Sequence, residues 1–160
     1  MCGIIAYIGN KPALPILLQG LRRLEYRGYD SAGVALIENN LIDRVRTIGK
    51  IDNLAERLKN HKSDSAIGLA HTRWATHGGV TEANAHPHIA LGGKLVIAHN
   101  GIIENYRELK DQLKGVEFTS QTDTEVLAHL IGYHYSGNLR LAVEKALAQV
   151  RGTYGLVVLH

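Results

Sequence analysis

Cysteine is almost absent from this sequence: its 160 residues contain only one, Cys2. A single thiol excludes an internal disulfide framework and a zinc site built from several cysteines, which leaves either a buried thiol or a reactive one. Long apolar runs are also missing, since no stretch approaches the roughly 18 to 20 residues of a membrane span. The N-terminus lacks the cationic segment that opens a secretory signal. We therefore expect a soluble, cytoplasmic protein.

Two further absences concern ligands. The 18 Lys and Arg and the 15 Asp and Glu give a net charge of +3 and are interspersed, so no nucleic-acid or membrane surface is indicated. No GxGxxG follows a predicted strand and no GxxxxGK[ST] occurs, so the usual signals of nucleotide binding are missing. What the sequence does have is 45% apolar residues in a length that suits one compact domain over residues 1–160.

Hydrophobic periodicity in the first half of the chain predicts strands with short connections and two helices. The apolar run Gly3–Ile8 suits a strand buried on both faces. Apolar residues at three- and four-residue steps after Pro12 predict a helix to about residue 24, and Asn39-Asn40 predicts a hairpin turn. The remaining predictions are a loop over 26–33, strands over 34–37, 41–48 and 66–71, and a short helix over 52–62.

Predicted helices are grouped in the second half, after an irregular segment over 72–89 that is long enough to indicate a functional loop. A strand over 94–99 is expected to stop at Asn100-Gly101. Further strands are predicted over 116–119 and 154–159, and helices over 104–113, 122–135 and 139–150. Early hairpins and late helices favour a layered α+β fold, with doubly wound α/β as the main competitor. Because the last strand has no polar tail, we expect the chain to be part of a longer protein.

Cys2 is the sharpest candidate for chemistry. Once Met1 is removed, Cys2 carries a free α-amine, whose ordinary pKa of about 7.7 to 8.0 suits it to accept the thiol proton near neutral pH. One residue then supplies both nucleophile and base, provided that a buried strand fixes the terminus. The alternative, a small buried hydrophobic residue, is the more common role of a cysteine.

The motif AHTRWATHG, over Ala70–Gly78, places an arginine beside the only tryptophan. The planar guanidinium of Arg73 suits a substrate carboxylate, because it makes two parallel hydrogen bonds. Considered alone, Arg73 is more typical of a surface ion pair, and Trp74 of a core residue or a loop anchor.

The motif AHNGIIEN, over Ala98–Asn105, places Asn100 and Gly101 directly after a predicted strand. The NH2 group of Asn100 and the backbone N–H of Gly101 can converge on one point, as an oxyanion hole requires. Asn-Gly is also a common turn dipeptide, and in isolation the turn is the stronger interpretation.

The motif SQTDTEV, over Ser120–Val126, has the spacing of a capping box between Thr122 and Glu125. Asp123 would then lie in the first turn of a helix, where the helix dipole favours a negative charge. Asp123 also suits a substrate ammonium, and both interpretations hold together if Thr122 caps the helix while Asp123 projects outward.

Four of the nine histidines, His71, His77, His86 and His88, fall in one strand and loop segment. Because no HExxH spacing and no second cysteine occur, we expect no metal site. We expect His77 to line a pocket, and His86 and His88 to brace a loop by hydrogen bonds.

Six sequence blocks, ordered along almost the whole chain, resemble the N-terminal glutaminase domain of the class II, or N-terminal nucleophile, glutamine amidotransferases. They are MCGI at 1–4, LEYRGYDSAG at 24–33, HTRWATHG at 71–78, NAHPH at 84–88, HNGIIENY at 99–106 and TDTEV at 122–126. Within the family, the blocks are most similar to the members that make glucosamine 6-phosphate from fructose 6-phosphate. Members that use phosphoribosyl pyrophosphate are expected to differ at Tyr29, Trp74 and His86.

The resemblance implies a four-layer αββα sandwich that hydrolyses the side-chain amide of L-glutamine to glutamate and ammonia. Cys2 matches the nucleophile that forms a thioester, and Asn100 and Gly101 match the oxyanion hole. No cofactor is implied. The sugar isomerase domains that receive the ammonia in the longer, presumed oligomeric enzymes would be the partner of this chain, and without them we expect no transfer to sugar.

By the same resemblance, the substrate is held at both ends. Arg73 matches the residue that binds the α-carboxylate of glutamine, and Asp123 the residue that binds its α-ammonium. The other matched positions are Trp74, Thr76 and His77 on the loop that closes over glutamine, and Arg27 and Gly28 on a loop near the nucleophile.

Three alternatives stay open. The chain could be the glutaminase domain of the phosphoribosyl-pyrophosphate type of amidotransferase. It could be a different amidase, such as an acylase, although Arg73 and Asp123 as a paired clamp for a zwitterion argue against this. It could also be a non-catalytic small-molecule-binding domain in which Cys2 is merely buried.

Overall fold

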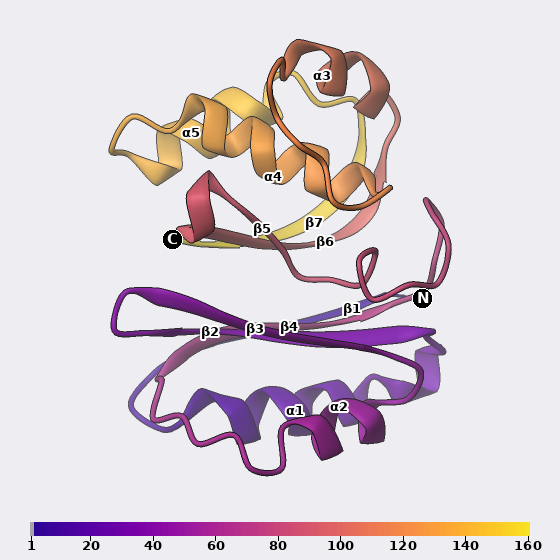
Figure 1. Cartoon of the computed structure of the whole chain (residues 1–160), viewed down its shortest axis with the longest axis vertical. Helices are drawn as coiled ribbons and strands as arrows, with labels where there is room; N and C mark the ends of the chain where they lie inside the picture. Colours follow the sequence, from indigo (N-terminus) through magenta and orange to yellow (C-terminus); the bar gives the residue numbers. More distant parts are fainter. Residues whose placement is uncertain (1) are drawn as a thin grey trace.

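A computed structural model describes residues 2–160 of the chain, which form four layers in the order helices, sheet, sheet, helices (Figure 1). The predicted αββα architecture is therefore confirmed, and Met1 lies outside the described residues. In chain order the elements, with η marking 3-10 helices, are β1 (Gly3–Ile8), α1 (Ala13–Arg23), η1 (Glu25–Arg27), β2 (Ser31–Glu38), β3 (Leu41–Ile48), α2 (Ile51–Arg57), β4 (Ile67–Arg73), β5 (His88–Ala90), η2 (Leu91–Gly93), β6 (Leu95–Ile103), α3 (Tyr106–Gln112), α4 (Asp123–His134), α5 (Leu139–Leu147) and β7 (Gly152–Leu159).

The first sheet has the strand order β1-β4-β2-β3 and is antiparallel throughout. Helix α1 begins after Pro12, and its leucines at three- and four-residue steps face this sheet, so that Leu17 and Leu21 are fully buried. Leu54 of α2 is buried in the same apolar cluster. Burial of these side chains fixes both helices on the outer face of the sheet.

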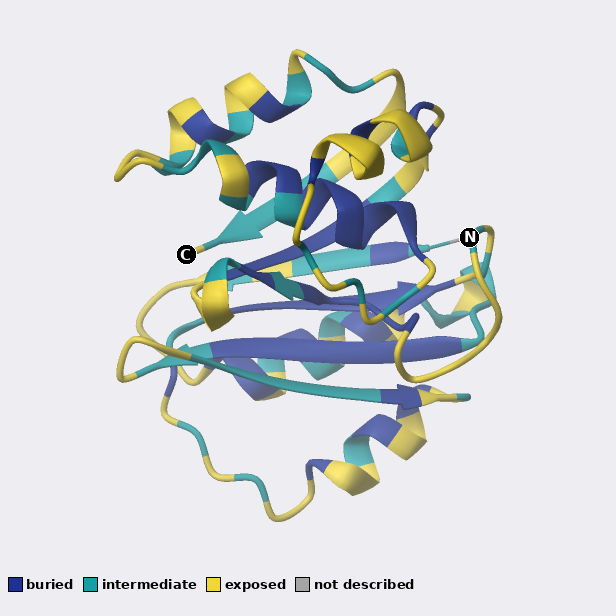
Figure 2. Ribbon diagram, turned by 45° about the horizontal axis from the view of Figure 1, so that its top comes forward, coloured by how far each residue is buried: buried dark blue, intermediate teal, exposed yellow. Residues whose placement is uncertain are grey.

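The second sheet has the order β5-β6-β7 and is covered by the later helices. Helix α4 is buried along most of its length, as its dark blue ribbon shows (Figure 2), because it packs between this sheet and the helices α3 and α5. Leu127 and Ile131 of α4 meet Leu95 and Ile97 of β6 in one apolar cluster.

The two sheets pack face to face through small and branched side chains. Ala35 and Leu69 of the first sheet meet Val96 and Ala98 of the second, and all four are buried. This packing brings the beginning of β1, the end of β4 and the middle of β6 to the same end of the sandwich. Segments that carry the predicted site residues are therefore assembled by the fold rather than by sequence proximity.

Strand β6 corrects one prediction, because it does not stop at Asn100-Gly101 but continues to Ile103. The reason is its partner: Asn100 pairs with Gly155 and Gly101 with Tyr154, so β7 carries the ladder past the dipeptide. The interpretation of Asn100-Gly101 as a turn is wrong.

Other boundaries also differ from the predictions. Residues 116–119 are not a strand, because Thr119 and Ser120 donate hydrogen bonds to the side chain of Glu125 instead. Strand β2 begins at Ser31 rather than at residue 34, since Ser31 pairs with Arg73 of β4. The short strand β5 was not predicted, and α2 and α5 end at Arg57 and Leu147, earlier than expected. Among the described residues, no helix has the length and apolar character needed to cross a membrane.

Candidate active site

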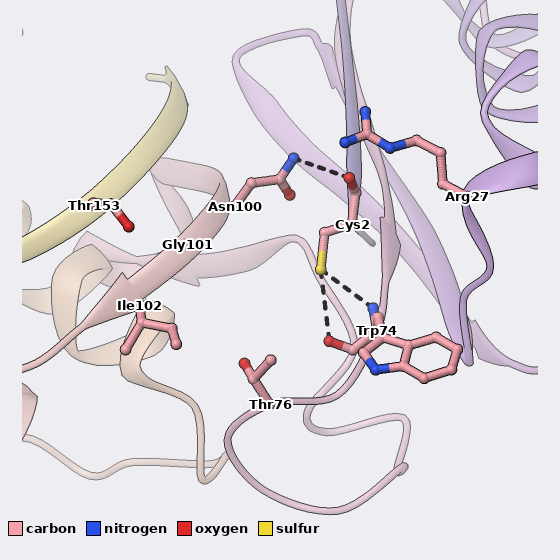
Figure 3. A pocket seen from close by; sticks show the side chains of 8 residues that line it. All are labelled: Cys2, Arg27, Trp74, Thr76, Asn100, Gly101, Ile102 and Thr153. Atoms are coloured by element: carbon pink, nitrogen blue, oxygen red, sulfur yellow. Dashed lines mark hydrogen bonds between the residues drawn. The ribbon is translucent and has the colours of Figure 1, made fainter.

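Cys2 directly precedes β1, whose first residue, Gly3, pairs with Thr72 of β4. The sulfur of Cys2 lies against the backbone of Trp74, just beyond the end of β4 (Figure 3). The Trp74 N–H donates to Sγ at 3.2 Å, and Sγ lies 3.6 Å from the Trp74 carbonyl oxygen. The cysteine is partly exposed, so the interpretation of Cys2 as a merely buried residue is not supported.

The side chain of Asn100 reaches across to Cys2 from β6 (Figure 3). Its Nδ2 donates to the backbone oxygen of Cys2 at 3.3 Å, and its Oδ1 lies 2.7 Å from Nε2 of His71. The NH2 end of Asn100 therefore faces the cysteine.

Gly101 has a φ of 131°, a conformation that side-chain-bearing residues rarely adopt. A Cβ atom built at this position would lie 1.9 Å from the backbone oxygen of Thr153. Only glycine fits, and its backbone lies at the surface beside Cys2.

An open cleft of about 640 Å³ surrounds the sulfur. Seven of its lining residues join Cys2 from four separate parts of the chain: Arg27, Trp74, Thr76, Asn100, Gly101, Ile102 and Thr153. Sequence reasoning missed Ile102 and Thr153. Thr153 comes to the cleft only because β7 pairs with β6, which no local sequence signal reveals.

A much smaller polar cavity, of about 20 Å³, lies on another side of Cys2. Cys2, Trp74, Thr76 and Gly101 line both spaces, so the sulfur lies where the open cleft meets the polar cavity. The other lining residues of the cavity are Arg73, His77, His86, His99, Thr122, Asp123 and Thr124. The predicted partners of a carboxylate and of an ammonium are thus in one cavity, next to the predicted nucleophile.

Arg73 is 3% exposed, so its interpretation as a member of a surface ion pair is wrong. Its guanidinium donates to the backbone oxygens of His77, Gly78 and Gly79. Burial lowers the pKa of Arg73, while negative charge on Asp30 opposes that shift. An arginine keeps its charge even so, and this cation is held by loop carbonyls that a carboxylate can replace.

Asp123 is 4% exposed, and it projects away from the helix into the fold rather than into solvent. Its Oδ2 accepts a hydrogen bond of 2.9 Å from the N–H of Ile103, which turns the carboxylate toward β6. Thr122 caps α4 as predicted, because its Oγ1 accepts from the Glu125 N–H. Asp123 therefore lines the cavity from the first turn of a capped helix.

Only one of the two hydrogen bonds of the predicted capping box forms, because the Glu125 carboxylate binds elsewhere. It accepts from the backbone and side chains of Thr119 and Ser120 rather than from the N–H of Thr122. Burial raises the pKa of Glu125, but these hydrogen bonds outweigh burial and lower it overall. The carboxylate thus fixes the chain that enters α4.

Buried histidines of β5, of β6 and of the segment before β5 contact the start of α4. His86 Nε2 and His99 Nδ1 each lie 2.8 Å from Oγ1 of Thr124, and His88 Nε2 lies 3.0 Å from Oγ1 of Thr122. The predicted bracing by His86 and His88 is confirmed. Burial lowers the pKa of both residues well below the ordinary value.

His77, as predicted, lines a pocket, and its ring meets Tyr106 edge-on at 5.1 Å between centroids. Among residues 2–160, no group of three or more His, Cys, Asp and Glu side chains is placed to hold a metal ion.

Asp30 is a site residue that sequence reasoning missed. Its Oδ2 accepts from the N–H of Ala75 at 2.5 Å, and its own N–H donates to the Arg73 oxygen at 2.7 Å. Asp30 thus holds the backbone on both sides of Trp74. Trp74 itself is 53% exposed, and a Cβ atom built on Gly28 would lie 3.5 Å from its indole.

Comparisons with known proteins agree with this geometry. A family model described as "Glutamine amidotransferase domain" matches residues 45–159. The chain is 52% identical to the glutamine–fructose-6-phosphate aminotransferase of Clostridium tetani, over 99% of the chain and 26% of that protein. It is 51% identical to the corresponding protein of Thermus thermophilus, over 100% of the chain and 27% of that protein. The chain thus spans about a quarter of the length of these curated relatives.

Solved structures show the same fold. A glutamine phosphoribosylpyrophosphate amidotransferase from B. subtilis, solved with ADP and GMP, has a TM-score of 0.85 and 27% identity, covering 99% of this chain and 35% of that one. A glutamine aminotransferase class-II domain protein from Silicibacter pomeroyi has a TM-score of 0.65 and 21% identity, covering 99% and 72%, which is a likeness of fold alone. The sequence identity to the phosphoribosylpyrophosphate enzyme is about half of the identity to the fructose-6-phosphate enzymes. The chain is therefore more similar to the fructose-6-phosphate enzymes.

Proposed function

Since the chain belongs to the glutamine amidotransferase domain family, we propose that it hydrolyses the side-chain amide of L-glutamine to glutamate and ammonia, with Cys2 as the nucleophile. The observation that carries this proposal is the position of the Cys2 sulfur. It lies where the open cleft meets a polar cavity that contains one buried cation, Arg73, and one buried anion, Asp123. A free α-amino acid with an amide side chain presents a complementary charge to each, and its amide to the sulfur.

The proposed reaction begins when the α-amine of Cys2, freed by removal of Met1, takes the thiol proton. The sulfur attacks the amide carbon, and the negative charge that forms on the amide oxygen is stabilised by the Asn100 NH2 and the Gly101 N–H. The ammonium of Cys2 returns the proton to the amide nitrogen, the carbon–nitrogen bond breaks, and ammonia leaves. Water, deprotonated by the same amine, then attacks the thioester and releases glutamate.

Substrate binding requires a change in the segment after Arg73. A cavity of about 20 Å³ holds no more than a water molecule. The carboxylate of glutamine therefore has to replace the oxygens of His77, Gly78 and Gly79 on Arg73, which moves these residues outward. Exchange of three carbonyl acceptors for a carboxylate keeps the buried cation paired, so the exchange costs little electrostatic energy.

We further propose that the ammonia is used by another part of a longer protein. The relatives named as glutamine–fructose-6-phosphate aminotransferases are about four times as long as this chain. By analogy with their name, the ammonia acceptor is fructose 6-phosphate, bound by sugar isomerase domains outside these 160 residues. The chain alone is then a glutaminase without sugar aminotransfer activity.

The proposed function is tested with 6-diazo-5-oxo-norleucine, an electrophile that resembles glutamine. We expect one equivalent to label Cys2 in chains that have lost Met1, excess glutamine to prevent labelling, and the Cys2→Ala variant to remain unlabelled. The same preparations are assayed for ammonia release. Labelling that glutamine does not compete with, or ammonia release that persists in Cys2→Ala, contradicts the proposal.

A further inference from the structure

His71 has no direct part in the proposed reaction, yet it contacts the side chain that does. It is fully buried in β4, and its Nε2 lies 2.7 Å from Oδ1 of Asn100. Because an amide oxygen only accepts hydrogen bonds, His71 donates Nε2–H in this contact. At its other end Asn100 donates Nδ2–H to the Cys2 oxygen. If the amide were turned over, its oxygen would face the Cys2 oxygen, and neither atom carries a hydrogen to donate.

We infer that His71 is a positioning residue for glutamine hydrolysis: its Nε2–H holds Oδ1 of Asn100, so that the Asn100 NH2 stays turned toward the carbon that Cys2 attacks. The inference rests on the proposed function, because it concerns the oxyanion formed in that reaction. An oxyanion donor contributes most when it is oriented before the reaction begins. A free Asn100 amide would present its oxygen to the developing negative charge in half of its orientations.

His71 is itself held in place from the opposite side. Its ring stacks on that of His86, with centroids 4.2 Å apart and planes inclined by 24°. His86 contacts Oγ1 of Thr124, the same oxygen contacts His99, and His99 precedes Asn100 in β6. The contacts form a closed ring of five residues, Asn100, His71, His86, Thr124 and His99. The ring fixes both the side chain of Asn100 and the backbone that carries it.

The ring also connects the two ends of the proposed substrate. Thr124 follows Asp123 in the first turn of α4, and Asp123 is the proposed partner of the substrate ammonium. The Thr124 hydroxyl carries one hydrogen, so it donates to one of its two imidazoles and accepts from the other. The protonation patterns of His86 and His99 are thereby coupled, because one ring donates to Oγ1 and the other accepts from it, and this coupling links the oxyanion donor to the helix turn that carries the ammonium partner.

The first test compares two substitutions of His71 in the full 160-residue chain. His71→Phe keeps an aromatic ring against His86 and removes the donor, while His71→Gln restores a donor without the ring. We expect His71→Phe to lower kcat by about 10- to 100-fold, which is less than the loss of about 10²- to 10³-fold when an oxyanion donor itself is removed. KM should stay within about twofold, because Arg73 and Asp123 are unchanged. His71→Gln should recover part of kcat, and equal losses in both variants would overturn the inference.

A double-mutant cycle then tests whether His71 acts through Asn100. Asn100→Ala should lower kcat by about 10²- to 10³-fold. Adding His71→Phe to that variant should lower kcat by less than about twofold more, since the amide to be oriented is gone. Fully additive losses would mean that His71 acts independently of Asn100, and would overturn the inference.

Two controls separate this role from general damage. Alkylation of Cys2 by iodoacetamide forms no oxyanion, so its rate should be the same in wild type and His71→Phe. A parallel fall of alkylation and hydrolysis indicates a merely structural role. If His71→Phe does not fold, the ¹⁵N resonances of the His71 ring in the wild type decide: a proton on Nε2 is expected, and a proton on Nδ1 overturns the inference.

Failure of the proposed function has a different signature. In that case wild type neither releases ammonia from glutamine nor reacts with 6-diazo-5-oxo-norleucine at Cys2, and the inference about hydrolysis falls with it. If wild type does both and His71→Phe has an unchanged kcat, only the inference about His71 fails.

Discussion

Two halves of the segment between β4 and β5 differ sharply in how they are held. Residues 74–80, the active-site half, are exposed or partly exposed, and Trp74 and Thr76 line the cleft. Residues 81–87 form the anchored half, in which residues 84–87 are buried. Arg46 donates to the oxygens of Ala83 and Ala85 at 3.0 and 2.9 Å, and Arg44 to the oxygen of Pro87.

The difference teaches that one irregular segment serves two purposes. The anchored half is bound by β3 and by α4, through contacts that take no part in the proposed substrate binding. The active-site half is bound by Arg73 and Asp30, and the Arg73 contacts are those that we propose a substrate carboxylate to replace. Low local stability is expected where few apolar contacts are buried, so the active-site half should open while the anchored half stays folded.

Acidification should have the largest effect, and it should loosen the anchored half, because His86 lies in that half and the rings of His71 and His88 pack against it. Burial lowers the pKa of His71 to about 4, and that of His86 and His88 well below the ordinary value near 6.5. Below pH 6.5 the unfolded chain binds protons that the folded chain rejects, so this stability is complete above pH 6.5 and is lost as the pH falls toward 4. At about 1.4 kcal/mol per pKa unit, His71 alone accounts for about 3 kcal/mol.

Urea denaturation at pH 7.5, 5.5 and 4.5 checks this expectation, with His71→Phe as the matched variant. The variant should lose less free energy of unfolding on acidification than wild type. Parallel curves for the two proteins would show that His71 does not contribute. Amide hydrogen exchange at residues 84–86 should rise on acidification, while residues 75–80 exchange fast at each pH.

Removal of an anchor should have the next largest effect. Arg46→Ala leaves the oxygens of Ala83 and Ala85 without their donor, which should lower the free energy of unfolding by about 2 to 3 kcal/mol. Arg140→Ala is the control, since its ion pair with Glu144 is exposed and lies outside this segment, so its loss should leave the free energy of unfolding nearly unchanged. Equal losses in the two variants, measured by urea denaturation, would show that Arg46 does not anchor residues 81–87.

Arg73→Lys should affect binding rather than the anchor. Lysine keeps the charge but cannot make two parallel hydrogen bonds to a carboxylate, so the KM for glutamine should rise by about 10- to 100-fold. Steady-state kinetics measures this, with the exposed Arg140→Lys as a control that leaves KM unchanged. An unchanged KM in Arg73→Lys would remove Arg73 from the substrate site.

The smallest effect is expected at Trp74. Because Trp74 is about half exposed, Trp74→Ala should change the free energy of unfolding by less than about 0.5 kcal/mol. Loss of the aromatic wall should raise KM by about 2- to 5-fold. A large loss of stability would show that the active-site half is anchored as firmly as the other half.

Much of the fold was predictable because apolar periodicity reports burial. The limits of β1 and β3 and the hairpin at Asn39-Asn40 agree with the predictions, since local pattern and tertiary pairing favour the same structure there. The end of β6 was not predictable, because its extension depends on pairing with a strand fifty residues later in the chain. The prediction of a strand over 116–119 is wrong for a related reason, because the N–H of Thr119 donates to the side chain of the buried Glu125 instead of to a neighbouring strand.

The candidate site was predictable where residue type and position indicate a chemistry, and the resemblance to a known family favoured that chemistry over the structural alternatives. Cys2, Arg73 and Asp123 were chosen in that way, and the structure brings them to one cavity. Asp30 was missed although it lies within one of the motifs, because its hydrogen bond to Ala75 joins two segments that only the β2–β4 register brings together. Long-range pairing thus limits both kinds of prediction.

The backbone at Gly101 has a consequence for attempts to change what this site accepts. The left-handed φ and the close approach of the Thr153 oxygen exclude every side chain at that position. Random mutagenesis of the cleft should therefore yield no functional variants at residue 101, whereas the exposed Ile102 beside it tolerates many. A selection for new amide substrates would have to vary the other residues of the cleft and keep Gly101, because the pairing of β6 with β7 fixes the backbone there.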